Sequence, residues 1–277
     1  MAREPAEATT LTVQGVQVPK LGFGTWQVTG AACREGVADA LALGYRHIDT
    51  ARMYGNEREV GQGIADSGVP REEIWLTTKV WPTEAAPEDL TASFARQLDA
   101  LDTGHVDLLL LHWPNPEVPL RETLGAMQEL QAQGLTRHTG VSNFPSALLR
   151  QALDLAPVLA DQVEYHAYLG QPALLELCRE RDVMLTAYSP FAHGHLLDDP
   201  VLAEVAGELG RTPGQVALRW LLDQPLVSVI PKASSHERRA ENLAVFDFAL
   251  SDQQRGRIAG LERGQRTADP SFAPDWD

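Results

Sequence analysis

The chain contains only two cysteines, Cys33 and Cys178, in 277 residues. Each lies in a segment with a helical pattern, and two such cysteines are too few for a disulfide framework or a metal site. We therefore expect both to be reduced packing residues of a cytoplasmic protein. The eight histidines show no HExxH spacing and the carboxylates show no ligand pattern, so we expect no bound metal.

Long apolar runs and an excess of positive charge are also absent. No apolar stretch approaches the length of a membrane-spanning helix, and residues 1–10 lack the apolar segment of a secretory signal. Acidic residues outnumber basic ones 38 to 23, which gives a formal net charge of -15. A field of this sign disfavours nucleic acids and anionic membranes as partners, and it repels an anionic cofactor unless local cations hold it.

The dinucleotide-binding fingerprint of a Rossmann fold, GxGxxG after a strand, is missing as well. What is present is an alternation of apolar, β-branched runs with amphipathic segments. Strands are predicted over residues 21–26, 45–48, 74–78, 106–111, 136–141, 161–164, 183–188 and 226–230, and helices over residues 31–43, 87–101, 172–181, 213–222 and 236–243, with others starting near 56, 120 and 145. Eight strand–helix units in order predict an α/β fold of the (β/α)8, or TIM-barrel, type.

The length of the chain suits either one barrel or two smaller domains. No linker or low-complexity segment interrupts the pattern, so we expect a single domain over residues 1–277. Residues 11–19 alternate apolar and polar side chains around Gln14 and Gly15, which predicts a β-hairpin before the first strand. Gly22 and Gly24 in the first strand allow a close approach of another backbone.

Residues 44–63 hold the polar stretch around which the predicted site is organised. A short strand ends before Asp49, and Tyr54 lies in the loop that follows. Asn56 is predicted to cap the next helix, with Glu59 three residues later as its capping-box partner. Because the carboxyl ends of the strands carry the chemistry in a parallel α/β fold, Asp49 and Tyr54 are expected at that end.

Lys79 and His112 end two further apolar runs, IWLTTK and VDLLLLH. A free tyrosine has a pKa of about 10, and a nearby ammonium group would lower it. A buried, unpaired lysine is costly, so Lys79 is expected to pair with Asp49. The four residues together predict a proton-donating site, although Tyr54 alone also fits a surface tyrosine and His112 alone a core histidine.

The stretches GYRHIDTARMYGNEREVG, TTKVW and LLHWP resemble three signature motifs of the aldo-keto reductase family. The resemblance continues in GVSNF, DQVEYH, AYSPF and IPKASSHERRAEN, and it covers nearly the whole chain. The short loops are most similar to the bacterial branch that includes 2,5-diketo-D-gluconate reductases. The resemblance implies that the N-terminal hairpin closes the bottom of the barrel and that Tyr54 is a general acid, tuned by Lys79 and Asp49, with His112 orienting a carbonyl.

The resemblance also implies how a nicotinamide cofactor binds without a Rossmann motif. Ser142, Asn143 and Gln162 would bind the carboxamide, and Tyr188, followed by Ser189, would stack on the ring. Lys232, Ser234 and Arg238 would hold the 2′-phosphate of NADPH or NADP, and Glu241 and Asn242 would contact the adenine. Arg238 and Arg239 also fit a solvated helix face. Ala233 stands where the family often has serine, which removes one hydrogen bond to the phosphate.

Trp26, Trp81 and Trp113 follow the same strand ends as the predicted catalytic residues. They predict an aromatic slot for the substrate, although core tryptophans fit the pattern too, and residues 267–277 are expected at its rim. We therefore expect an NADP-dependent oxidoreductase, a cytoplasmic monomer that reduces a small-molecule carbonyl such as an aldehyde, ketone or keto-sugar. Two alternatives remain: a non-catalytic, cofactor-binding regulatory subunit, and a hydrolase that would need a second strand-end carboxylate beside Asp49.

Overall fold

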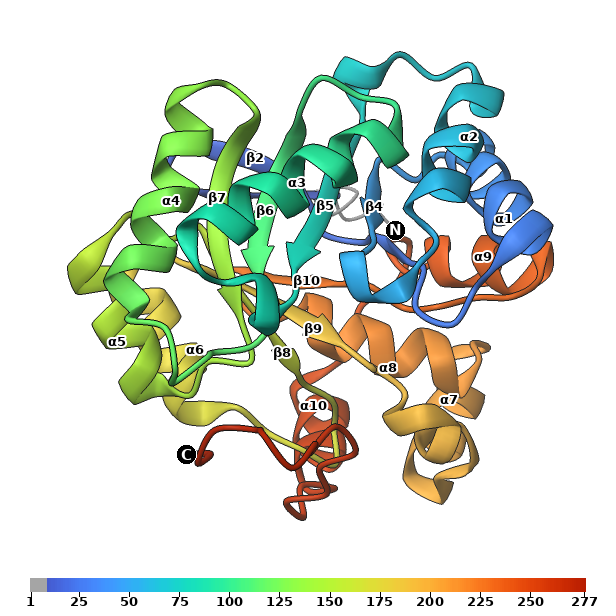
Figure 1. Cartoon of the computed structure of the whole chain (residues 1–277). Helices are drawn as coiled ribbons and strands as arrows, with labels where there is room; N and C mark the ends of the chain where they lie inside the picture. Colours follow the sequence, from blue (N-terminus) through green and yellow to red (C-terminus); the bar gives the residue numbers. More distant parts are fainter. Residues whose placement is uncertain (1–8) are drawn as a thin grey trace.

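The computed structural model describes residues 9–277, so the predicted lack of a secretory signal concerns residues that lie mainly outside it. Eight parallel strands form one sheet in chain order (Figure 1). They are β3 (Phe23–Gly24), β4 (His47–Asp49), β5 (Trp75–Val80), β6 (Val106–Leu111), β7 (Thr136–Ser142), β8 (Ala160–Glu164), β9 (Met184–Tyr188) and β10 (Val227–Val229). The predicted order of eight strands is confirmed.

The sheet closes on itself between its first and last strands. The backbone N–H of Gly22 donates to the carbonyl of Val229 over 2.8 Å, and the N–H of Val229 donates to the carbonyl of Lys20 over 2.8 Å. A Cβ atom on Gly24 would lie 2.6 Å from the carbonyl oxygen of Ile230, closer than any side chain tolerates. Closure at this seam therefore requires glycine, and the prediction of a TIM barrel is confirmed.

Helices surround the strands (Figure 1). Eight follow the strands as predicted: α1 (Gly30–Leu43), α2 (Glu57–Ser67), α3 (Pro87–Leu101), α4 (Leu120–Ala132), α5 (Ser146–Leu155), α6 (Pro172–Arg181), α8 (Pro213–Leu222) and α9 (His236–Leu243). Two more were not predicted, α7 (Pro200–Leu209) and α10 (Asp252–Ala259). Both begin with recognisable signals, since Asp199 caps α7 and a capping box of Ser251 and Gln254 starts α10.

The N-terminal hairpin, β1 (Thr10–Val13) and β2 (Val16–Pro19), covers one end of the barrel as expected. Its side chains Leu11, Val13 and Val18 form an apolar cluster with residues near the starts of the strands, including Leu159 and Met184. A second cluster fills the space between the strands and the helices. The hairpin thus closes the amino-terminal end and leaves the carboxyl-terminal end of the barrel open for a site.

Asn56 occupies the N-cap position of α2, but its side chain makes no capping hydrogen bond. Its amide nitrogen donates to the carbonyls of Thr25 (2.9 Å) and Val28 (2.8 Å), and its oxygen accepts from the Thr50 hydroxyl (2.8 Å). The predicted capping box with Glu59 is therefore wrong. Long-range partners take the side chain, which joins the loop after β3 to the loop after β4 at the open end of the barrel.

Among residues 9–277, no helix is long and apolar enough to cross a membrane. The two cysteines are buried and unpaired, as expected for packing residues.

Candidate active site

Asp49, Tyr54 and Lys79 meet at the carboxyl-terminal end of the barrel. Lys79 lies inside β5, not after it, and is fully buried. Its ammonium donates to the Asp49 carboxylate over 2.6 Å, to the Thr50 carbonyl over 2.8 Å and to the Tyr54 hydroxyl over 3.4 Å. The three side chains predicted to act together therefore form one hydrogen-bonded group.

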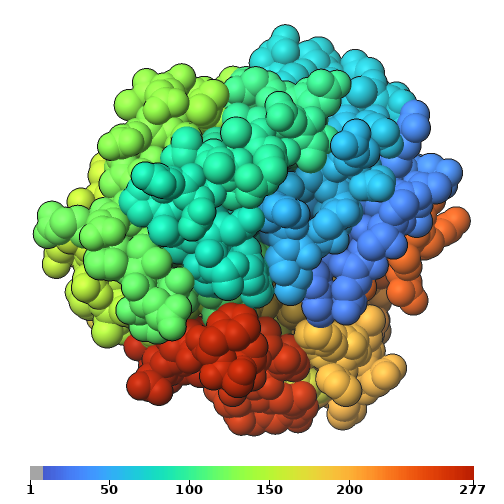
Figure 2. Space-filling view, viewed as in Figure 1, coloured from blue at the N-terminus to red at the C-terminus, as the bar shows by residue number. Residues whose placement is uncertain are grey.

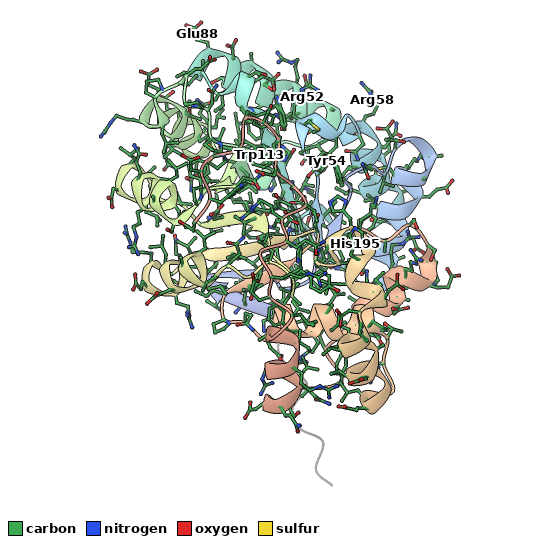
Figure 3. The ribbon with its side chains drawn as sticks, turned by 90° about the horizontal axis from the view of Figure 1, so that it is seen from below. Arg52, Tyr54, Arg58, Glu88, Trp113 and His195 are labelled. Carbon is green, nitrogen blue, oxygen red and sulfur yellow. The ribbon has the colours of Figure 1, made fainter. Side chains whose placement is uncertain are left out.

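His112 directly follows β6 and completes this group. Its ring lies edge-on to the Tyr54 ring, with centroids 5.8 Å apart, and edge-on to Trp81 at 5.2 Å. In Figure 3, Tyr54 and Trp113 lie near the centre of the molecule, whereas Arg58 and Glu88 lie at its edge. A phenol, a buried lysine–carboxylate pair and an imidazole are thus brought together on loops and strand ends from distant parts of the chain.

Burial sets the charge states of these groups. It lowers the pKa of the Lys79 ammonium, and the adjacent Asp49 carboxylate opposes that shift. Burial, and then the charge of Lys79, hold the pKa of His112 well below its usual value, so the imidazole is neutral at pH 7. The prediction that Lys79 lowers the pKa of Tyr54 is wrong. Burial, and then the Asp49 carboxylate, raise that pKa well above 10.

A cavity of about 590 Å³ opens above these residues. Its lining includes most of the residues predicted to bind a cofactor or substrate: Trp26, Asp49, Tyr54, Trp81, His112, Trp113, Asn143, Gln162, Tyr188, Ser189, Lys232 and Arg238. Four predicted cofactor residues, Ser142, Ser234, Glu241 and Asn242, do not line it. Glu241 instead accepts a hydrogen bond from the Thr212 hydroxyl over 2.5 Å, and Asn242 is buried in α9.

One wall of the cavity is a buried network of amides. Asn143, with φ of 63°, donates to the His112 carbonyl over 2.9 Å and accepts from the Tyr188 hydroxyl over 2.7 Å. Gln162 donates to the second oxygen of Asp49 over 2.7 Å, and Ser142 donates to the Gln162 carbonyl over 2.7 Å. The network links the predicted carboxamide-binding residues to Asp49 and His112, and it presents amide edges beside the Tyr188 ring.

The other end of the cavity is cationic. Lys232 lies 5.9 Å above the Trp26 ring, and its ammonium lies 3.4 Å from the Gln27 side-chain oxygen. Arg238 is exposed in the first turn of α9, where the helix dipole favours an anion. Arg239, by contrast, is buried and pairs with Asp39 over 2.6 Å, so the alternative of a solvated helix face does not hold for it.

The tail after α10 forms part of the cavity rim, as predicted. Thr267 and Ala268 line the cavity, and the Phe272 ring lies edge-on to Trp81 (5.9 Å) and Trp113 (5.6 Å). Further lining residues were not among the predicted site residues: Met53, Phe191, His193, Leu197 and Ile230. Met53 adjoins Tyr54 and Ile230 lies two residues before Lys232, while Phe191, His193 and Leu197 belong to the loop after Tyr188. In residues 9–277 no cluster of three or more His, Cys, Asp or Glu side chains is placed to hold a metal.

Comparison with known proteins identifies the relatives of this chain. The model of the aldo/keto reductase family matches residues 20–263. The chain is 40% identical over 255 residues to an aldo-keto reductase of Mycolicibacterium smegmatis, covering 91% of this chain and 92% of the relative. It is 38% identical over 268 residues to the methylglyoxal reductase DkgB of Salmonella typhimurium (94% and 99% covered) and 38% identical over 255 residues to a glyoxal reductase of Bacillus subtilis (91% and 92%).

The fold has a similarly close counterpart among solved structures. The crystal structure of a putative 2,5-diketo-D-gluconic acid reductase B superposes with a TM-score of 0.95 at 42% identity, and 98% of each chain is covered. A thermostable aldo-keto reductase, Tm1743, superposes with a TM-score of 0.87 at 39% identity, covering 91% of this chain and 99% of that one. Sequence and fold agree along almost the full length, and the chain belongs to the aldo/keto reductase family.

Proposed function

We propose that this protein is an NADPH-dependent reductase of aldehydes and ketones in which Tyr54 is the general acid. The observation that carries the proposal is the contact of the Tyr54 hydroxyl with the buried Lys79–Asp49 pair on the floor of the cavity. The relatives that reduce glyoxal or methylglyoxal support carbonyl reduction as the reaction class. Asp49 is the one carboxylate among the described lining residues, which disfavours the two-carboxylate hydrolase.

A reduced nicotinamide, when bound, supplies the hydride that reaches the carbonyl carbon. Tyr54 gives its phenolic proton to the carbonyl oxygen as negative charge develops there, and the Lys79 ammonium stabilises the phenolate that remains. The neutral His112 orients the carbonyl oxygen by a hydrogen bond. Asp49 keeps Lys79 charged and in place.

The residues of the cavity fit this cofactor. The Asn143 and Gln162 amides offer donors and acceptors for a carboxamide beside the Tyr188 ring, and Lys232 and Arg238 supply the local cations that an anionic cofactor needs in a protein of net charge -15. Ser142 lies outside the cavity lining and supports this network by donating a hydrogen bond to the Gln162 carbonyl. Ser234 lies outside the cavity lining, so we assign the phosphate contacts to Lys232 and Arg238. Glu241 and Asn242 also lie outside it, so we assign no adenine contact to them.

Replacing Arg238 with alanine is expected to reduce the preference for NADPH over NADH by about tenfold or more, because a charged hydrogen bond to phosphate contributes roughly 1.5–3 kcal/mol. The KM for NADPH rises, while the kinetics with NADH barely change. The measurement is kcat/KM for both cofactors. Arg58→Ala, at the edge of the molecule in Figure 3, is the matched control. Equal losses of kcat/KM with both cofactors would show that Arg238 does not bind the 2′-phosphate.

The pH profile of the reduction should follow the raised pKa of Tyr54. The acid form donates the proton, so a raised pKa keeps the donor protonated, and kcat/KM for reduction is expected to stay level from neutral pH to about pH 10. Alcohol oxidation needs the phenolate, so its rate should climb over the same range. A loss of reduction below about pH 9 that follows a single ionisation would show that the pKa of Tyr54 is not raised.

The reaction class itself is tested with a panel of aldehydes, ketones and keto-sugars, with NADPH oxidation read by absorbance. Among the described lining residues, lysine and arginine side chains occur only at the phosphate end. We therefore expect small uncharged carbonyls, such as glyoxal and methylglyoxal, to be turned over faster than carbonyls that carry a carboxylate. Tight NADPH binding without turnover of any carbonyl would instead favour the non-catalytic regulatory subunit.

A further inference from the structure

A second buried carboxylate, Glu164, lies at the open end of the barrel and takes no part in the chemistry described above. It is the last residue of β8 and is fully buried. It lies two residues after Gln162, on the same side of the strand, and pairs in register with Tyr188. Since a buried carboxylate is costly unless it is hydrogen-bonded, its partners indicate its role.

The partners of Glu164 come mainly from the far end of the chain. One oxygen accepts hydrogen bonds from the Thr267 N–H (2.9 Å), the Thr267 hydroxyl and the His166 ring nitrogen (2.9 Å). The other accepts from the N–H groups of Thr267 (3.0 Å) and Ala268 (2.8 Å). Burial alone would raise the pKa of Glu164, but the hydrogen bonds from His166, Thr267 and Ala268 lower it, so the group stays ionised.

Residues 267–277, which we name the C-terminal strap, run from this anchor across the mouth of the cavity. Figure 2 shows the C-terminal segment, in red, lying between the green and gold segments. Its far end is held where Asp277 accepts hydrogen bonds from the N–H (2.8 Å) and hydroxyl (2.7 Å) of Ser146. Between the two anchors Phe272 packs on Trp81 and Trp113, and Trp276 packs on Trp113.

We propose that Glu164 is a positioning residue that fastens the C-terminal strap over the cavity, so that Thr267 and Ala268 complete its wall and Phe272 packs on Trp81 and Trp113 at the rim. The proposal rests on the proposed reductase function for its kinetic consequences, but not for the anchoring itself. An ionised acceptor facing two backbone N–H groups holds the strap more firmly than a neutral one. Bulky substrates that reach the strap depend on this anchor, and small substrates that stay near Tyr54 do not.

The anchoring is tested without catalysis by limited digestion with trypsin. Arg263 and Arg266 directly precede the strap, so cleavage after either residue releases it, and mass spectrometry reports the rate. Glu164→Gln replaces a carboxylate that accepts from two backbone N–H groups with a neutral amide. We therefore expect the strap to be released at least about tenfold faster than in the wild type. Glu180→Gln makes the same change on the surface of α6 and should leave the rate unchanged. Equal rates in both variants would overturn the proposal.

The kinetic consequence is tested with two substrates on the same variants. We expect Glu164→Gln to raise KM for a bulky aromatic aldehyde by about tenfold with kcat little changed, and to leave KM for methylglyoxal within about twofold. Thr267→Val, which keeps Glu164 but removes a donor, should shift KM in the same direction and guards against misfolding of the first variant. Faster strap release with unchanged KM for both substrates would reduce Glu164 to a structural anchor and overturn the positioning role.

The two tests separate the inference from the function on which it rests. A wild-type protein that turns over no carbonyl would refute the proposed reductase, while the trypsin result would still decide whether Glu164 holds the strap. Turnover with equal digestion rates would leave the reductase in place and refute the anchor.

Discussion

Tyr54→Phe is expected to lower kcat for carbonyl reduction by about 10² or more, the scale of general acid catalysis. The substitution removes the hydroxyl that lies 3.4 Å from the Lys79 ammonium and keeps the ring against His112. Cofactor affinity should stay nearly unchanged, because the phenol lies at the floor of the cavity, away from Lys232 and Arg238. Steady-state turnover and a fluorescence titration with NADPH measure the two quantities.

A Tyr54→Phe variant that retains most of its turnover would refute the assignment of Tyr54 as the acid. A loss of turnover together with a large loss of NADPH affinity would point to a damaged cavity instead. His112→Gln provides a graded comparison, since it removes the orienting ring and leaves the acid in place.

Asp49→Asn is expected to lower the free energy of unfolding by about 3–5 kcal/mol, because it leaves the fully buried Lys79 without its charged partner. The same substitution disturbs the hydrogen bond from Gln162, so turnover should fall as well. Urea denaturation at pH 7, followed by circular dichroism, measures the stability change.

The double variant Asp49→Asn/Lys79→Met separates the two effects. An apolar side chain of similar length removes the unpaired charge, so stability should recover toward the wild type while turnover stays low. If the single variant were as stable as the wild type, the Lys79–Asp49 pair would not be the buried ion pair described here.

The clustering of Asp49, Tyr54, Lys79 and His112 was predictable because each lies at or near a strand end, and the strand ends of a parallel barrel converge. Lys79 and His112 follow apolar runs that can be recognised from neighbouring residues in the sequence. Periodicity and composition carry that information without knowledge of any distant contact.

What sequence reasoning missed depends on contacts between distant residues. Asn56 has a good local partner in Glu59, yet its side chain binds the loops around Thr25 and Thr50. The pKa of Tyr54 follows from the depth of its burial, which no motif encodes. In the sequence, Glu164 is one more residue of β8. Its role becomes visible only from its hydrogen bond with Thr267, which lies far along the chain. The unpredicted α7 and α10 differ, since their capping signals were local and were passed over.

A nascent chain cannot complete this barrel until β10 has left the ribosome. Gly22 and Val229, which pair across the seam, lie near opposite ends of the sequence. Before that point β3 and β9 both present rows of unpaired backbone donors and acceptors, which readily pair with other chains. Closing so long a loop is also slow, because its entropy is lost before the seam contacts form. The interval before β10 has left the ribosome is therefore the stage at which the chain is most exposed to aggregation.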